Sequence, residues 1–461
     1  MRNRIALPSA RFRLGVALAV CVLGAVGCDH LLRVQDPDVA SPGSVAGADK
    51  LPTQLGAAIG AFNLAFGGDG SGGNEGLVNM TGLFTDEFSF TETFPTRIVV
   101  DQRTTTDNNS TLLTIFFNIE QARALAASAS AAYTQFAPNS PDQSQALSLE
   151  AYSQMLMAEM YCGAVPFSTQ NSDGTQSNTT PLTTVQMLNT SIATFDSALT
   201  IAVDSGDHAR EYLARIGKAR AYMDLGGAAN MAIADTIVTT VPTTFTYLVL
   251  HSENTTRENN GVNELVWSEG RWSVGDNEGT NGLDFVSAHD PRVGVVNLGE
   301  GFAGAGTTVW APLKDSVRSS PEVVASGVEA RLIEAEAELR AGNTATWLND
   351  LNALRAEAKT DLGVDSTLAP LSDPGPANNA ELLLTMRERA FWLFATAHRL
   401  GDMRRLVRDY GLSANSVYPT GTYIFASAPQ GTYGPDLVFP VPLEEGNNPD
   451  FNASACDVTV P

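Results

Sequence analysis

The stretch TMRERAFWLFATAHRLGDMRRLVRDYG, residues 385–411, decides how the chain folds. Between Ala390 and Ala397 nearly every residue is apolar. A helix that is apolar all round has to be enclosed on every side. Arginines crowd the carboxyl end of the stretch, where they suit the helix dipole, and Gly411 supplies a C-cap. The pattern predicts one central helix over residues 385–410, inside a helical assembly.

Composition and charge limit the class of protein. The chain has 461 residues, of which 43% are hydrophobic and 17% are charged, enough for a sizeable core. This length fits two or three domains, or one large one. The net charge at pH 7 is −23. So acidic a surface repels phosphate backbones, and no basic stripe offsets it, so we expect no nucleic-acid partner.

The first residues have the features of a targeting segment. Residues 1–27 combine four arginines with the apolar run Leu14–Val26, which is too short to span a bilayer. The run ends in Ala-Val-Gly-Cys, which resembles a bacterial lipobox with Cys28 as the lipidated residue. This predicts a lipoprotein signal peptide over 1–27 and a lipidated, extended tether over 28–52. An ordinary secretory peptide followed by an incidental cysteine is the alternative.

Helical spacing recurs in pairs through residues 53–241. Apolar residues repeat every three or four positions in several segments, which end at Gly, Pro or Asp-Gly turns. The predicted helices cover residues 53–66, 112–133, 145–161, 188–199, 211–225 and a short stretch after 227. Paired helices of this length are typical of tetratricopeptide-like repeats, although the Trp/Leu/Gly consensus of that repeat is absent. We therefore expect a mainly α protein with an N-terminal scaffold of helix pairs.

The composition changes at Pro242. Residues 242–320 have little helical period and are rich in Gly, Asn, Thr and aromatic residues. Exposed aromatic rings offer flat faces to sugar C–H groups, and Arg and Asn offer directional hydrogen bonds. The insert therefore predicts an irregular, loop-rich ligand-binding subdomain, assisted by the Gly-rich loop 67–76. The candidate ligand-binding residues are Trp272, Trp310, Phe302 and Arg271. Packing of the insert onto the helices is the alternative role for each tryptophan.

Helical pattern returns in the C-terminal region, residues 321–461. Pro321 stands where a helix start is expected, and a second helix follows over 344–358. The central helix comes next, and then an irregular tail rich in Gly, Pro and Tyr.

Several of these segments resemble one family. RERAFWLFATAHRLGDMRR resembles the late helix of SusD/RagB proteins, with Thr396-Ala397 and Leu400-Gly401 as departures from the family pattern. The residues in register are Arg387, Glu388, His398, Arg399, Asp402 and Arg405. AEMYCGAVPFS, GVNELVWSEGRW, EARLIEAEAELR with LNALRA, and LVFPVPLEEGNNPDF resemble further family segments, in the family's order.

The resemblance implies a function. SusD/RagB proteins are nutrient-binding lipoproteins anchored in the outer membrane of Gram-negative bacteria. By that likeness the chain would capture oligosaccharide or peptide and close, as a hinged lid, over a SusC-like TonB-dependent transporter. It would be exposed at the cell surface, and it would not be an enzyme.

Residues suited to catalysis are scarce. The five histidines are scattered and none has metal-ligand spacing such as HExxH, so we expect no metal, no cofactor and no catalytic residue. Two other functions stay open. A lipid-anchored glycan-active enzyme would need two carboxylates facing each other across a cleft. A helical-repeat scaffold that binds only proteins would have no use for an aromatic-rich insert.

The cysteines predict one disulfide. Cys21 leaves with the signal peptide and Cys28 is modified, which leaves Cys162 and Cys456 in an oxidising compartment. We expect these two to join the C-terminal tail to the end of the first helix pair. Two separate buried thiols are the alternative.

Overall fold

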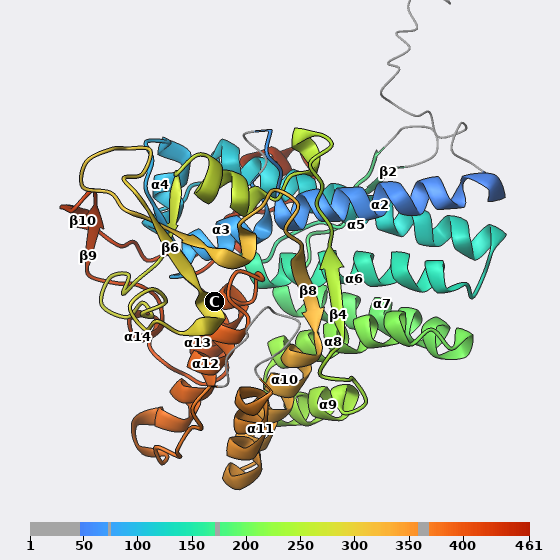
Figure 1. Cartoon of the computed structure of the whole chain (residues 1–461). Coiled ribbons are helices and arrows are strands. Elements are labelled where there is room, and N and C mark those ends of the chain that lie inside the picture. Colours follow the sequence, from blue (N-terminus) through green and yellow to red (C-terminus); the bar gives the residue numbers. More distant parts are fainter. Residues whose placement is uncertain (1–46, 72–74, 171–175, 358–367) are drawn as a thin grey trace, which may run out of the picture. The chain divides into compact units, whose positions relative to one another are not determined.

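The computed structural model describes residues 47–71, 75–170, 176–357 and 368–461 (Figure 1). Helices dominate this part of the chain, and its sheets are two-stranded. The prediction of a mainly α protein is confirmed. The signal peptide, Cys28 and most of the tether lie outside the described residues. No helix within the described ranges is both long and apolar enough to cross a membrane.

The N-terminal half is built from helices that pack on their neighbours in sequence (Figure 1). They are α2 (Leu51–Gly67), α5 (Ser110–Phe136), α6 (Pro141–Met160), α7 (Thr184–Ser205), α8 (His208–Leu225) and α9 (Ala228–Val238). Each predicted helix is present and most begin a few residues earlier than the apolar spacing. The reason is capping: the side chains of Asn109, Ser140, Thr183 and Asp207 accept the first free N–H groups. The pairing also agrees with the predicted scaffold.

Short elements connect and flank this scaffold. Between α2 and α5 lie α3 (Leu77–Phe84), β1 (Phe88–Phe90) and α4 (Pro95–Asp101), and β2 (Thr169–Gln170) pairs with β3 (Gln176–Ser177). The insert contains β4 (Thr246–Val249), a π-helical turn (Asn263–Ser268), β5 (Trp272–Val274), β6 (Val295–Gly299) and β7 (Val309–Pro312). β1 pairs with β5 and β6 with β7, both antiparallel. The low helical content of the insert therefore agrees with the weak helical period in its sequence.

The helix expected to start at Pro321 starts later. Glu322–Ser326 forms strand β8, which pairs with β4, and α10 spans Gly327–Arg340. The β-branched Val323 and Val324 suit a strand. The Ser326 side chain then caps α10 by accepting the N–H of Glu329 at 3.1 Å. α11 (Thr344–Ala356) follows as expected.

The central helix is two helices, not one. α12 spans Ala380–Trp392 and α13 spans Arg399–Arg408. Between them, Ala395 and Ala397 have φ angles of 49° and 59°, in the left-handed region that ends a helix. Residues 390–397 are buried, as predicted, but the prediction of one continuous helix over 385–410 was wrong.

Side chains from distant segments make the break possible. The Ala395 N–H donates to Glu87 Oε1 at 2.8 Å, and Lys314 Nζ donates to the carbonyls of Phe394 and Ala395 at 2.5 and 2.9 Å. Arg220 Nη2 donates to the Ala397 carbonyl at 2.8 Å. Buried backbone groups need such partners. An apolar pattern in the sequence carries no information about them.

A buried cluster of charged residues connects α12 and α13 across the break. Asp402 accepts from Arg389 at 2.9 and 3.0 Å and from Arg405 at 2.6 Å. Arg405 and Arg389 also contact Glu336 on α10. Burial raises the pKa of Asp402, but the two guanidinium groups outweigh burial and hold that pKa well below its ordinary value. We call these four residues the Asp402 cluster.

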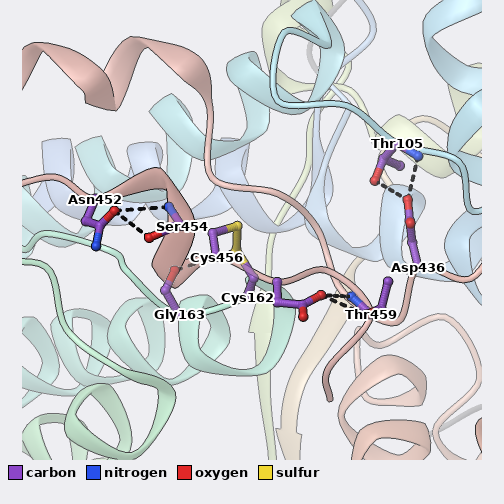
Figure 2. The surroundings of a disulfide bond; sticks show 9 residues. Thr105, Cys162, Gly163, Asp436, Asn452, Ser454, Cys456 and Thr459 are labelled. Carbon is purple, nitrogen blue, oxygen red and sulfur yellow. Dashed lines mark hydrogen bonds between the residues drawn. A yellow bond between two sulfur atoms is a disulfide. The ribbon is translucent and has the colours of Figure 1, made fainter.

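The C-terminal tail returns to the end of α6. After α14 (Ala414–Val417) and the hairpin β9 (Thr422–Phe425) with β10 (Ala428–Thr432), Phe439 bridges to Tyr161 in parallel. Figure 2 shows Cys162 and Cys456 joined in a disulfide, the pair expected from the sequence. It also shows Asp436, which accepts from the Thr105 N–H at 2.6 Å and so holds the tail near α5.

Candidate functional site

Trp272 is not a ligand platform. It lies on β5 with 1% of its surface exposed, and its Nε1–H donates to Glu92 Oε1 at 3.2 Å. Pairing of β5 with β1 encloses the ring, which packs 6.3 Å from the ring of Phe88. The glycine and arginine beside it in the sequence suggested an exposed loop. That prediction was wrong because β5 finds its partner strand far away in the sequence.

Trp310 is half-buried on β7. Its backbone N–H donates to Ser273 Oγ at 2.9 Å, and its ring packs partly against the core. The residue is only partly buried, so a role in binding remains a prediction.

Phe302 and Arg271 lie together, as a binding site would require. Phe302 is 52% exposed, and the Arg271 guanidinium carbon lies 4.1 Å from the centre of its ring. The Phe302 N–H donates to the Gly270 carbonyl at 2.7 Å, which fixes its loop beside β5. The exposed ring is therefore supported from one side by a planar cation.

A second exposed phenylalanine has the same kind of support. Phe94 is 48% exposed at the start of α4, and the Arg97 guanidinium carbon lies 4.8 Å from its ring centre. Arg97 and Arg271 both donate to Glu92, at 2.7 Å each, and Glu92 is fully buried. One carboxylate thus fixes both guanidinium groups, and through them both rings.

We call this arrangement the Glu92 platform. It comprises Phe94 and Phe302 at the surface, Arg97 and Arg271 against their rings, and Glu92 below. The indole N–H of Trp272 completes the contacts of Glu92. Glu75, from the Gly-rich loop, contacts Arg97, and Glu269 contacts Arg271. The platform therefore offers two apolar rings whose positions are fixed by charge-assisted hydrogen bonds.

Sequence reasoning missed Glu92, Phe94 and Arg97. They belong to the segment TETFPTR, residues 91–97, which has no clear helix or strand period. A signal was present: an acid, an aromatic and a base stand within six positions around a proline that starts a helix. What the segment does not reveal is that Glu92 reaches Arg271, because that contact spans 179 positions of the chain.

Two acidic residues near the platform already accept hydrogen bonds from tyrosine hydroxyl groups. Tyr423 Oη donates to Asp101 at 2.6 Å, and Tyr433 Oη donates to Glu278 at 2.6 Å. Burial raises the pKa of both acids, that of Glu278 to about 7. The first pair holds β9 against the end of α4, and the second holds the residue after β10 against the insert. Nowhere in the described ranges do three or more His, Cys, Asp or Glu residues gather as a metal site would need.

A cavity of about 470 Å³ lies elsewhere, between the start of α7 and the C-terminal tail. Its walls include apolar side chains, Arg404, Arg408 and the disulfide residue Cys162. It contains none of the predicted ligand-binding residues.

The fold is therefore that of a scaffold of helix pairs carrying a loop-rich insert with an exposed aromatic surface. Several solved structures with a similar fold are described as SusD/RagB proteins. A SusD/RagB family protein from Bacteroides thetaiotaomicron matches with a TM-score of 0.64 and 14% identity, covering 88% of this chain and 96% of that one. A SusD-like carbohydrate-binding protein from Bacteroides fragilis matches with a TM-score of 0.62 and 14% identity, covering 88% and 99%.

A third solved structure with a similar fold comes from another genus. A SusD superfamily protein from Parabacteroides distasonis matches with a TM-score of 0.60 and 14% identity, covering 87% of this chain and 98% of that one. No protein-family model and no curated protein matches the chain. The chain has the SusD/RagB fold, and the resemblance found in its sequence segments is confirmed at that level.

Proposed function

We propose that the chain is a SusD-type binding protein that captures oligosaccharides on the Glu92 platform, without chemical conversion. The observation that carries this proposal is the pair of exposed phenylalanines fixed through two arginines to one buried carboxylate. Two rings that are about half exposed add little to stability, so their support by buried charges suggests a binding role. Structures of the same fold include proteins described as SusD-like carbohydrate-binding proteins.

The platform suits the chemistry of sugars. The C–H face of a pyranose is apolar and stacks on an aromatic ring, while hydroxyl groups at its edge seek polar partners. Rings whose positions are fixed before binding lose little conformational entropy when a ligand arrives. Peptide side chains could use the same surface, and the experiment below distinguishes them.

The same proposal includes the cellular setting. Cys28 would carry the lipid, residues 1–27 would be removed, and residues 28–52 would tether the protein to the outer membrane. A SusC-like TonB-dependent transporter would receive the ligand. Labelled palmitate should enter the wild type and not Cys28→Ser, and label retained in that variant would refute the anchor.

The binding test uses the purified mature protein on an array of oligosaccharides and peptides. We expect glycan binding that falls about ten- to a hundredfold in Phe302→Ala and in Phe94→Ala, at unchanged melting temperature. The matched control is Phe117→Ala, because Phe117 is 60% exposed on α5 and is not one of the platform residues. Equal losses in all three variants, or binding of peptides alone, would contradict the proposed function.

A further inference from the structure

The two hairpins that border the Glu92 platform contain no positively charged residue. Phe302 lies in the loop of the β6–β7 hairpin, residues 295–312, whose one charged residue is Glu300. The β9–β10 hairpin, residues 422–432, has no charged residue. This hairpin touches the platform's surroundings: the rings of Phe90 and Phe425 lie 5.5 Å apart, and Ser427 Oγ donates to the Gly306 carbonyl at 2.8 Å.

The two cations of the platform are already engaged. Arg97 contacts both Glu92 and Glu75, and its side chain is 6% exposed. Arg271 contacts both Glu92 and Glu269, and its side chain is 20% exposed. Two guanidinium groups therefore share three carboxylates. Counted with Glu75 and Glu269, the platform carries a net negative charge, and neither guanidinium group can leave its carboxylates without breaking its ion pair to the buried Glu92.

Apart from Glu300, the polar groups left for a ligand on the two hairpins are uncharged. These exposed side chains are amides and hydroxyls, namely Asn297, Thr308, Thr422, Ser427, Gln430 and Thr432. Amides and hydroxyls donate to and accept from sugar hydroxyl groups, but they do not compensate a carboxylate or a sulfate. The chain's net charge of −23 adds a repulsive field at low ionic strength.

We propose that the Glu92 platform selects uncharged oligosaccharides and rejects their uronate and sulfate counterparts. This inference rests on the proposed function and narrows its ligand class. Selection arises because an anionic sugar meets a surface that is already negative and has no cation to spare. A neutral sugar of the same shape meets no such penalty.

The first test measures the affinity of the mature protein for matched polysaccharides: β-1,4-mannan against β-1,4-polymannuronate, methyl-esterified polygalacturonate against the free acid form, and dextran against dextran sulfate. We expect binding to at least one neutral member and at least tenfold weaker binding to its acidic counterpart. Equal or tighter binding of the acidic member would overturn the selectivity and leave the proposed function standing. Binding to none of the six would overturn both.

The second test adds the missing cation. Glu300→Lys places a positive charge two positions before Phe302 in the sequence, on an exposed side chain. It should raise the affinity for the acidic polysaccharide about three- to tenfold, and about 0.5 M salt should abolish the gain. Glu357→Lys, at the end of α11, makes the same change of net charge far from the β9–β10 hairpin (Figure 1). An equal gain in both variants, or none in Glu300→Lys, would contradict selection by local charge.

Discussion

The Asp402 cluster and the Glu92 platform use the same chemistry for different purposes. In both, buried carboxylates bind two arginines through short hydrogen bonds. In the Asp402 cluster all four residues are buried and join α10, α12 and α13. In the Glu92 platform each arginine continues outward to an exposed ring. The comparison indicates that the role of a buried ion pair depends on what else its arginines contact. Arginines that contact only buried groups stabilise the fold, and arginines that also contact exposed rings can position a binding surface.

The largest expected effect is on stability at the Asp402 cluster. Asp402→Asn removes the charge between Arg389 and Arg405, which leaves buried guanidinium groups under-compensated. The free energy of unfolding should fall by about 3–5 kcal/mol in urea denaturation. Asp196→Asn, which breaks a pair whose aspartate is 54% exposed, should cost less than about 1 kcal/mol. A variant at 402 that keeps full stability but loses ligand would reverse the assignment of roles.

The next effect is on binding at the platform. Glu92→Gln keeps one acceptor oxygen but loses the charge that fixes Arg97 and Arg271. Affinity for the neutral glycan should fall about tenfold, with a smaller loss of stability than Asp402→Asn causes. Glu269→Gln, which touches Arg271 alone, should weaken binding less than about threefold. If Glu92→Gln and Glu269→Gln bind the neutral glycan with equal affinity, Glu92 does not fix the positions of the two phenylalanine rings.

A third prediction concerns the pH dependence of stability. It separates Asp402, whose charge is compensated by two arginines, from a buried acid whose pKa is raised by burial. Glu87, beside the break between α12 and α13, is fully buried, and burial raises its pKa to about 8, although the Ala395 N–H opposes the shift. The unfolded chain releases this proton near pH 4.5, the folded chain near pH 8. The contribution to stability is therefore complete below pH 4.5 and is lost as pH rises towards 8.

The measurement is urea denaturation at a series of pH values. Stability should fall by about 1 kcal/mol between pH 6 and pH 7. Glu87→Gln should reduce this fall in the free energy of unfolding with pH. Part of the fall should remain, because burial also raises the pKa values of Glu120 and Glu278 to about 7. Asp402 is ionised in both states over this range and adds nothing. Stability that rises between pH 6 and pH 7 would refute the prediction.

The smallest effect tests the shape of the cation. Arg271→Lys keeps the charge near Glu92 but loses the planar group that lies against Phe302. Affinity should fall severalfold, with no change in melting temperature. Arg318→Lys, on an arginine whose side chain is 49% exposed, is the control and should bind as the wild type does.

Local patterns in the sequence predicted the helices well and the site only in part. Apolar spacing identified the helix pairs, because each helix buries one face against its neighbour. The break between α12 and α13 was missed because its backbone groups bond to Glu87, Lys314 and Arg220, which lie far away in the sequence. Phe302 and Arg271, which composition suggested, lie in contact and belong to the proposed site. Trp272 was misjudged, and Glu92 was missed, because strand pairing and ion pairs across the chain decide which groups are buried.

The disulfide has a consequence for proteolysis. Cys162 and Cys456 are 294 positions apart, so most of the folded part of the chain lies within one covalent ring. A protease that cuts a single peptide bond inside this ring releases no fragment, because each piece keeps one cysteine of the bond. Phe302, within the ring, would stay attached to Phe94, outside it. A nicked molecule would therefore keep both rings of the platform until a reductant separated the pieces.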